Sequence, residues 1–501
     1  MPFLCCGGST EENVVTEDGA GRGVPGDASP PVIAEGDEEK EKAIAESIYH
    51  DARQSLTMSM VYRPLNVSLM RSNFSLDTKP QELLMKNNAA AKQGVTDSVV
   101  VRQGLEQQPA SSGFQANPGY PGSLTDKELE ACLEFRKFIR DKRPEEPTYY
   151  EIVHCYDDFE DEAFSLCRIM RARNFVVQDA VTLLGGSIET WGEARAHNFY
   201  PDLQQAMGCP ASIVPTELPL IPSGIAKNGS MVAYFKAGSI DLKFLDCLTD
   251  LDNFISFIWN TFTHRFREMA VQAQKEFPNT TILGEVTIVI DLKGISRSLF
   301  TEKVMEVLKK AIKVLNCFPE ALSKLIIFNA PFFFSAIWLV LKVFLDPRTI
   351  QKVDIFAYES SGMKCIAEHI DSTQLIADYG GKGPSCQDIL HQLREKGTLR
   401  EVVERFMINS RGNKSWDVEL AANEKATVSV LTRSSGGVQF TIEKSGEKVG
   451  DVVVEPDGGG SGAYTKTIVS GVAGPGKLTV AANSSSSHTE YFLVVVRVYP
   501  A

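Results

Sequence analysis

Residues 325–345 read LIIFNAPFFFSAIWLVLKVFL and match the length of a transmembrane span. Asn329 and Pro331 interrupt this stretch near its start, and proline disfavours helix at the residue before it. The first part, LIIFNA, therefore predicts a buried strand. The second part, residues 332–345, predicts a helix of about 21 Å, which is short of a hydrocarbon core of about 30 Å. A helix that is apolar on all sides, in a soluble protein, needs a further explanation.

Strands and helices alternate on both sides of this stretch. The predicted strands cover residues 231–238, 282–292, 324–330 and 352–358, and the predicted helices cover residues 251–276, 301–316 and 332–345. Residues 286–290, VTIVI, are apolar on both faces, as in a central parallel strand. The alternation predicts a mostly parallel sheet with right-handed crossovers.

The flanking regions have different patterns. Thr125 and Glu128 form a capping box for a helix over residues 124–142, and the helical period continues over 159–170 and 177–191. Beyond Trp416, short β runs with Gly- and Ser-rich turns predict an antiparallel sandwich. The expected regions are a disordered acidic tail (1–122), a helical lobe (123–200), an α/β lobe (201–385), a helical connector (386–408) and an all-β sandwich (409–501).

The chain has 501 residues and a formal charge of −13, which argues against nucleic acid as a partner. Residues 1–50 hold much of this acidity, so the folded part can approach an anionic membrane. Ten cysteines without a CxxC pair indicate reduced thiols in a cytoplasmic protein, and no signal peptide is evident. Cys5 and Cys6 either accept a palmitoyl chain or belong to an unmodified terminus.

Several motifs together resemble the CRAL-TRIO lipid-binding family. In the family's order these are residues 290–296 (IDLKGIS), 318–320 (FPE), 328–331 (FNAP), 344–347 (FLDP) and 379–381 (YGG), preceded by 171–175 (RARNF). The terminal β region is similar to a GOLD domain, which follows CRAL-TRIO in patellin-type proteins. The resemblance implies that residues 123–200 and 201–385 form the two CRAL-TRIO lobes and 409–501 the GOLD sandwich.

The resemblance implies a hydrophobic pocket that is closed by a mobile gate helix, and residues 332–345 fit that gate. The alternative is a helix that is simply buried in the core. Val286 and Ile288 are expected on the pocket strand. The expected gate and lining residues are Phe332, Phe333, Phe334, Ile337, Trp338, Leu341, Phe344 and Leu345.

The family's phosphatidylinositol-binding members carry a headgroup pair that matches Glu320 and Lys352, with Thr349 three residues before the lysine. An ammonium and a hydroxyl can donate to phosphate, and a carboxylate can accept from ring hydroxyls. The alternative is a surface salt bridge. Arg173 is a further candidate headgroup ligand or a contact between lobes, because Asn174 replaces the family's usual lysine.

The family's phosphatidylcholine-binding members carry hydroxyls where this chain has Val286 and Ile288, which counts against that lipid. No nucleophile–base set stands out, so no enzyme, no metal and no cofactor other than a bound lipid is expected. Two other functions stay open. One is a carrier of a neutral isoprenoid or sterol-like lipid, and the other is a GOLD-mediated trafficking adaptor, peripheral at Golgi, endosomal or plasma membrane.

Overall fold

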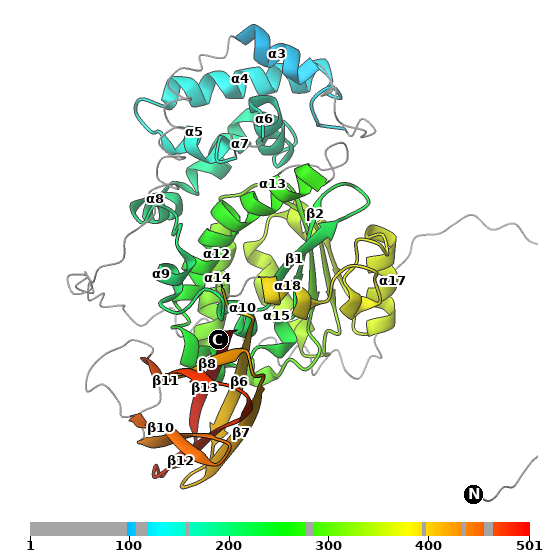
Figure 1. Cartoon of the computed structure of the whole chain (residues 1–501). Helices are drawn as coiled ribbons and strands as arrows, with labels where there is room; N and C mark the ends of the chain where they lie inside the picture. The colour runs from blue at the N-terminus through cyan, green and yellow to red at the C-terminus, as the bar shows by residue number, and fades with distance from the viewer. Residues whose placement is uncertain are drawn as a thin grey trace, which may run out of the picture.

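The computed structural model describes residues 98–106, 118–156, 160–276, 284–392, 397–432, 437–454 and 464–501. These residues form a helical lobe, a five-stranded sheet with helices on both faces, and a β-sandwich that carries the C-terminus (Figure 1). Cys5 and Cys6, and most of the predicted acidic tail, lie outside the described residues. The fold class predicted from the sequence, an α/β region followed by an all-β sandwich, is confirmed.

The helical lobe comprises α3 (Ser98–Glu106), α4 (Asp126–Lys142), α5 (Thr148–Val153), α6 (Glu162–Arg171), α7 (Val177–Gly185) and α8 (Ile188–Ala196). The predicted capping box is present at α4. The Thr125 backbone N–H donates to Glu128 Oε2 over 2.8 Å, and the Glu128 N–H donates to Thr125 Oγ1 over 3.3 Å.

Helix α3 lies inside the range that we predicted to be disordered, so the prediction is wrong there. Val101 and Leu105 are buried in the core of the helical lobe, together with Leu166 of α6. Gly104 lets the two helices approach closely, because a Cβ at this position would lie 3.3 Å from Ala163 Cβ. The short apolar stripe of α3 is stabilised by tertiary burial, which the surrounding polar composition does not reveal.

The central sheet has the order β1 (Leu220–Ile225), β2 (Met231–Phe235), β3 (Val286–Asp291), β4 (Leu322–Phe328) and β5 (Val353–Ile355). Strands β2 to β5 are parallel and β1 is antiparallel to β2. The mostly parallel sheet is therefore confirmed, although β1 was not predicted. Pro222 and Gly224 obscure β1 in the sequence, and both are tolerated because β1 is an edge strand.

Helices cover both faces of the sheet (Figure 1). One face carries α12 (Asn253–Asn260), a π-helical turn η2 (Thr261–Arg265), α13 (Phe266–Glu276), α14 (Glu302–Leu315) and α15 (Phe334–Leu341). The other face carries α17 (Glu359–His369) and α18 (Cys386–Gln392). Val286 and Ile288 belong to the first face. Thr287 belongs to the second, where its hydroxyl lies 2.7 Å from Ser230 Oγ.

The predicted helix over residues 332–345 is shorter in the structure. It consists of α15 and a 3₁₀ turn, η4 (Lys342–Phe344), and is followed by α16 (Pro347–Gln351). Asp346 caps α16 and Pro347 occupies its first position, which ends the preceding apolar segment. Within the described ranges, no helix is both long and apolar enough to cross a membrane.

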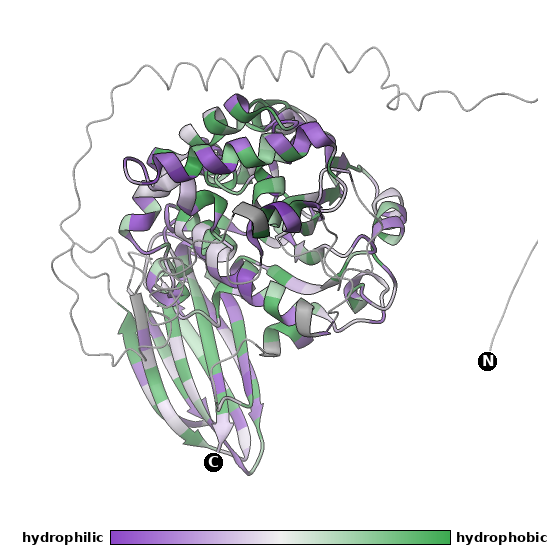
Figure 2. Ribbon diagram, turned by 90° about the horizontal axis from the view of Figure 1, so that it is seen from above, coloured by the Kyte–Doolittle hydropathy of each residue, from purple (hydrophilic) through white to green (hydrophobic). Residues whose placement is uncertain are grey.

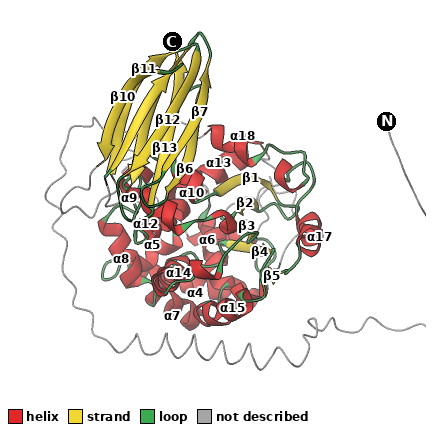
Figure 3. Ribbon diagram, turned by 90° about the horizontal axis from the view of Figure 1, so that it is seen from below, coloured by secondary structure: helices red, strands yellow, loops and turns green. Residues whose placement is uncertain are grey.

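The C-terminal sandwich consists of two antiparallel four-stranded sheets (Figure 3). One sheet has the order β10 (Glu447–Val454), β9 (Val438–Lys444), β12 (Gly476–Ser484) and β7 (Asn413–Leu420). The other has the order β11 (Tyr464–Ala473), β8 (Glu424–Thr432), β13 (Glu490–Pro500) and β6 (Arg400–Ile408). Hydrophobic and hydrophilic residues are mixed along the strands of the sandwich (Figure 2). Burial alternates along β7 and β12, as expected for a half-buried sheet, whereas β13 is buried at most positions.

The helical connector that we predicted over residues 386–408 is wrong in part, because Arg400–Ile408 form strand β6. Its charged residues suggested a polar helix, but its backbone pairs with β13 along the edge of the sheet. Phe406 and Ile408 enter the sandwich core, while Glu401 and Arg405 find ion-pair partners. Pairing and burial thus override the helical appearance of the segment.

The sandwich shares a hydrophobic cluster with α9 (Leu203–Met207), α10 (Val214–Glu217) and α11 (Leu242–Leu248). Leu431, Leu493 and Val495 supply the sandwich side of this cluster. Arg405 Nη2 lies 2.8 Å from Oε2 of the buried Glu217, so a charge pair also crosses the contact. The sheet β11–β8–β13–β6 is therefore packed against the rest of the molecule.

Candidate functional site

A cavity of about 210 Å³ lies on the face of the sheet that β3 and β4 present to the helices. Its walls are mainly apolar, with polar side chains gathered toward the start of β4 and the turn around α16. The lining residues include Ala172, Arg173, Leu183, Phe262, Val286, Ile288, Ile290, Phe318, Glu320, Leu325, Leu345, Asp346, Thr349 and Lys352. The structure thus brings the predicted strand residues and the predicted headgroup residues to one cavity.

Glu320 is the central charge of the polar end. Its side chain is only 8 % exposed, and its Oε2 lies 3.1 Å from Lys352 Nζ and 3.8 Å from Arg171 Nε. Arg348 Nε donates to the other carboxylate oxygen, Oε1, over 3.2 Å. Glu320 also has a φ of +59°, a backbone conformation that is uncommon for residues other than glycine. The surrounding contacts therefore hold this carboxylate in one position.

The cations determine the protonation state of Glu320. Burial by itself raises the pKa of a carboxyl group. The pull of Lys352, Arg171 and Arg348 outweighs burial here, so the pKa of Glu320 lies below its usual value. Glu320 is therefore an anion at neutral pH, and it can accept hydrogen bonds but not donate them.

Lys352 is held by two acceptors. Its Nζ donates to Glu320 Oε2 over 3.1 Å and to the Leu322 carbonyl oxygen over 2.6 Å. An ammonium group has three N–H donors, so one remains for a ligand in the cavity. Thr349, one helical turn earlier on α16, adds a hydroxyl to the same wall.

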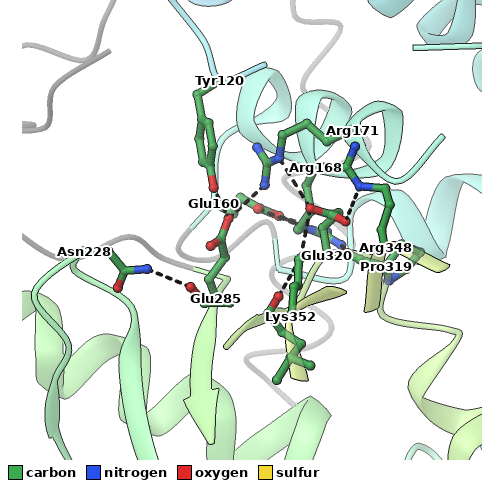
Figure 4. A network of polar contacts seen from close by, with 12 residues as sticks. Tyr120, Glu160, Arg168, Arg171, Asn228, Glu285, Pro319, Glu320, Arg348 and Lys352 are labelled. Carbon is green, nitrogen blue, oxygen red and sulfur yellow. Dashed lines mark hydrogen bonds and ion pairs between the residues drawn. The ribbon is translucent and has the colours of Figure 1, made fainter. Parts of the chain in front are cut away.

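A wider network joins this end of the cavity to the helical lobe (Figure 4). Arg171 Nη2 donates to Glu285 Oε1 over 2.8 Å, and the Tyr120 hydroxyl donates to the same oxygen. The Arg171 guanidinium also lies 3.7 Å from the centroid of the Tyr120 ring, a cation–π contact. These contacts fix α6 against the start of β3.

A buried charge pair supports the turn that carries Glu320. Arg168 donates to Glu160 over 3.0 Å, and both side chains are almost fully buried. Arg168 Nη1 also donates to the Pro319 carbonyl oxygen over 3.2 Å, so the guanidinium reaches the residue next to Glu320 (Figure 4). Removing either charge would leave the other buried without a partner.

The sequence did not single out Tyr120, Glu285 or Arg348 as site residues. Tyr120 lies in the range predicted to be disordered, and its contact with Glu285 spans 165 residues. No local pattern signals a pair at that separation. Arg171 is part of the quoted RARNF motif, so its importance could have been inferred from that motif.

Arg173 lines the cavity, but its charge is already matched. Its Nη1 lies 2.6 Å from Asp346 Oδ2 and donates to the Ala172 carbonyl oxygen over 2.7 Å. Asp346 follows the apolar segment directly and caps α16. Arg173 therefore links the helical lobe to the C-terminal end of that segment.

The predicted gate residues divide into three groups. Leu345 lines the cavity. Phe334 and Ile337 are buried, and Phe333, Trp338 and Leu341 are partly buried, in a neighbouring apolar cluster with Leu292 and Ile327. Phe332 and Phe344 are exposed, as are Leu339 and Val343 of the same segment. The segment thus has an inner face on the sheet and an outer face that is apolar and open to solvent.

Among the residues that the structure describes, no group of three or more His, Cys, Asp or Glu side chains could hold a metal ion. The cavity itself is an apolar chamber with one charged end. Such a chamber can hold an amphipathic molecule whose polar group is anionic and carries hydroxyls.

Comparison with known proteins gives a consistent assignment. The CRAL/TRIO domain family matches residues 218–381, which include all five strands of the central sheet. The chain is 27% identical to the CRAL-TRIO domain-containing protein YKL091C of Saccharomyces cerevisiae over 296 residues, covering 58% of this chain and 88% of that protein. It is 26% identical to the SEC14 cytosolic factor of Eremothecium gossypii over 284 residues, covering 56% of this chain and 84% of that protein.

A third relative is the phosphatidylinositol/phosphatidylcholine transfer protein SFH4 of Arabidopsis thaliana. It is 25% identical over 227 residues, covering 41% of this chain and 35% of that protein. The motif order, the parallel sheet and the family match all agree over the same region. Residues 218–381 of this chain are a CRAL/TRIO domain.

Proposed function

We propose that this protein binds a phosphatidylinositol-class lipid in the cavity and exchanges it with membranes or presents it there, without catalysing a reaction. The observation that carries the proposal is the placement of Glu320, Thr349 and Lys352 together at the polar end of an apolar cavity. A relative named as a phosphatidylinositol/phosphatidylcholine transfer protein supports a phospholipid ligand that includes this class.

The charges at the polar end favour an anionic headgroup. Glu320 supplies one negative charge and contacts two cations, Lys352 in the cavity and Arg348, which is about 35 % exposed and lies outside the cavity lining, so the cluster carries one excess positive charge. Arg171 and Glu285, like Arg173 and Asp346, neutralise each other. A phosphodiester carries one negative charge and would complete this balance through charge-assisted hydrogen bonds.

The same residues suit the hydroxyl-rich ring of inositol. The Glu320 carboxylate can accept hydrogen bonds from ring hydroxyls, and Thr349 can donate or accept. A neutral isoprenoid or sterol has no phosphate to accept from the remaining N–H of Lys352, so a polar donor in the cavity would be left without a partner. The inositide is therefore favoured over the neutral lipid.

The strand wall disfavours phosphatidylcholine. Val286 and Ile288 face the cavity without a hydroxyl, and Thr287 lies on the opposite face with Ser230. A choline-lipid phosphate at this wall would lose its hydrogen bonds to water without replacement. Transfer of phosphatidylcholine is not part of the proposed function.

Loading requires the apolar segment to move. The cavity of about 210 Å³ is below the roughly 300–1,000 Å³ of sites that enclose drug-sized ligands, and a diacyl lipid is larger still. The outer face of the segment exposes Phe332, Leu339 and Val343. Lys309 Nζ lies 5.6 Å from the centroid of the Phe344 ring, next to this face. At an anionic bilayer, acyl chains would replace water around these side chains and favour the open state.

The sandwich supports a second candidate function, that of a GOLD-like adaptor. Its sheet β11–β8–β13–β6 is covered by α9, α10 and α11, so a protein partner would meet the sheet β10–β9–β12–β7. The contact of the sandwich with α9, α10 and α11 would tether any such partner to the α/β region. The adaptor role would thus accompany lipid binding.

A vesicle assay tests the proposal. Donor vesicles carry labelled phosphatidylinositol, labelled phosphatidylcholine or labelled cholesterol, and the full chain is added with unlabelled acceptor vesicles. We expect transfer of phosphatidylinositol at least tenfold faster than that of the other two lipids. Equal transfer of all three lipids, or transfer of cholesterol alone, would contradict the proposed headgroup site.

A further inference from the structure

A second hollow adjoins the cavity on the side of the helical lobe. It has a volume of about 450 Å³ and is lined by polar side chains from α7, from the turn into α8 and from the end of α14. These include Asp179 and Thr182 of α7, Ser187, and Asn316, which follows α14. We call this hollow the side port.

The side port and the cavity share three lining residues, Arg173, Leu183 and Asn316. The two spaces therefore meet at a common wall next to the polar end of the cavity. No residue of α15 is among the side chains described as lining the side port, so this route does not pass the apolar segment. A path from the side port to the polar end would pass these three side chains and would not pass α15.

The chemistry of the side port suits a neutral polyol. Thr182 Oγ1 donates to the Gln178 carbonyl oxygen over 2.8 Å, which leaves its lone pairs free to accept. The Asn316 carboxamide offers donors and an acceptor, and the Asp179 carboxylate accepts from hydroxyls. These groups can exchange hydrogen bonds with several hydroxyls at once.

The common wall adds the cationic part of the site. Arg173 borders both spaces, and its partner Asp346 lies at the cavity side. Thr349 and Lys352 also line the cavity. A molecule with a phosphate in the cavity and hydroxyls in the side port would satisfy both groups of residues.

We infer that the side port admits a water-soluble phosphorylated polyol to the Glu320–Lys352 end of the cavity while α15 stays closed. This inference rests on the proposed headgroup site and extends it to a ligand without acyl chains. A phosphate joined to a polyol ring is also the headgroup of phosphatidylinositol.

The first experiment measures binding of myo-inositol 1-phosphate to the full chain by calorimetry, without vesicles. Thr182 is exposed on α7, so Thr182→Trp fills the side port without disturbing the core. Gln178→Trp is the matched control, because Gln178 is exposed one turn earlier on the same helix and lines neither space. Loading of labelled phosphatidylinositol from vesicles is measured in parallel for every variant.

We expect myo-inositol 1-phosphate to bind the wild-type chain and the control, and Thr182→Trp to weaken this binding at least tenfold. Phosphatidylinositol loading by Thr182→Trp should stay within twofold of wild type, whereas Lys352→Ala should weaken both ligands. Loading of the lipid without any binding of the soluble compound would overturn the inference and leave the proposed function standing.

Two further results would also overturn the inference. One is equal binding of the soluble compound by wild type and Thr182→Trp. The other is equal binding of inorganic phosphate and myo-inositol 1-phosphate, which would show that the side port does not contact the polyol. Failure of both the soluble compound and the lipid to bind would remove the proposed function as well.

Discussion

Lys352 Nζ lies 3.1 Å from Glu320 Oε2, and this ion pair stands at the polar end of an otherwise apolar cavity. The two residues are 32 positions apart, one at the entry to β4 and the other at the entry to β5. Parallel neighbouring strands bring their entry points to one edge of the sheet. The pairing therefore follows from the topology of the sheet.

Lys352→Ala should weaken phosphatidylinositol loading about 10- to 100-fold, because a charge-assisted hydrogen bond contributes about 1.5–3 kcal/mol. The measurement is equilibrium loading from labelled vesicles. Lys324→Ala is the matched control. Lys324 has a similar exposure and also a single carboxylate partner, Asp354 at 2.7 Å, but does not line the cavity. Equal loading by Lys352→Ala and wild type would return Lys352 to a purely structural role.

Introducing hydroxyls on the strand wall should change the lipid preference. The double variant Val286→Ser/Ile288→Thr places two hydroxyls in the cavity, and we expect measurable phosphatidylcholine loading that the wild type lacks. Burying the hydroxyls should cost about 1–3 kcal/mol of stability each where they lack partners. Val289→Thr, on the opposite face of β3, carries a similar cost without facing the cavity. Phosphatidylcholine loading by Val289→Thr alone would contradict the assignment.

Arg405→Ala should lower the free energy of unfolding by about 3 kcal/mol, because Glu217 would stay buried without its partner. Burial already raises the pKa of Glu217 against the opposing pull of Arg405. Lys477→Ala breaks an exposed pair with Asp417 and should cost less than about 1 kcal/mol. Denaturation of both variants and wild type, followed by tryptophan fluorescence, measures the difference.

The same experiment tests whether the sandwich is fused to the rest of the molecule. Because the shared cluster includes Leu493 and Val495, we expect the sandwich and the α/β region to unfold in one transition. Two separate transitions, with Arg405→Ala affecting only one of them, would show that the sandwich is an independent unit.

Acidification should erase the contribution of Glu320 to stability. The pKa of Glu320 is lower in the folded chain than its usual value of 4.5, so the folded state favours the anion. This stabilisation is present above pH 4.5 and is lost as the pH falls through the lowered pKa. The stability difference between wild type and Glu320→Gln should therefore shrink below pH 4.5.

Glu162 provides a comparison for this pH dependence. Burial would raise the pKa of Glu162, but His154 and Arg136 outweigh it and lower the pKa to about 2. The stability difference between wild type and Glu162→Gln should fade between pH 4.5 and about 2. A difference that stays constant with pH for both variants would contradict the electrostatic account of these carboxylates.

The sheet could be predicted because its strands are strongly apolar and alternate with helices, as at Val286–Asp291 and Glu302–Leu315. Strand β1 was missed because Pro222 and Gly224 are poor strand formers that only an edge tolerates. Strand β6 was missed because Glu404 and Arg405 belong to ion pairs that form only in the folded chain.

The site could be predicted in part. Glu320, Thr349 and Lys352 were identified through motif spacing, and the structure places all three at one cavity. Tyr120 and Glu285 could not be identified from the sequence, because their contact depends on how the helical lobe folds onto the sheet. The pairing of Arg173 with Asp346 is likewise a tertiary contact that no local pattern encodes.

The most direct test of the central claim is mass spectrometry of the lipids that copurify with the full chain. We predict a phosphatidylinositol-class lipid in the extract from wild type and from Lys324→Ala, and its depletion by about tenfold or more in the extract from Lys352→Ala. An extract that contains only neutral isoprenoids or sterols, unchanged in Lys352→Ala, would contradict the assignment of Glu320, Thr349 and Lys352 to an inositol headgroup.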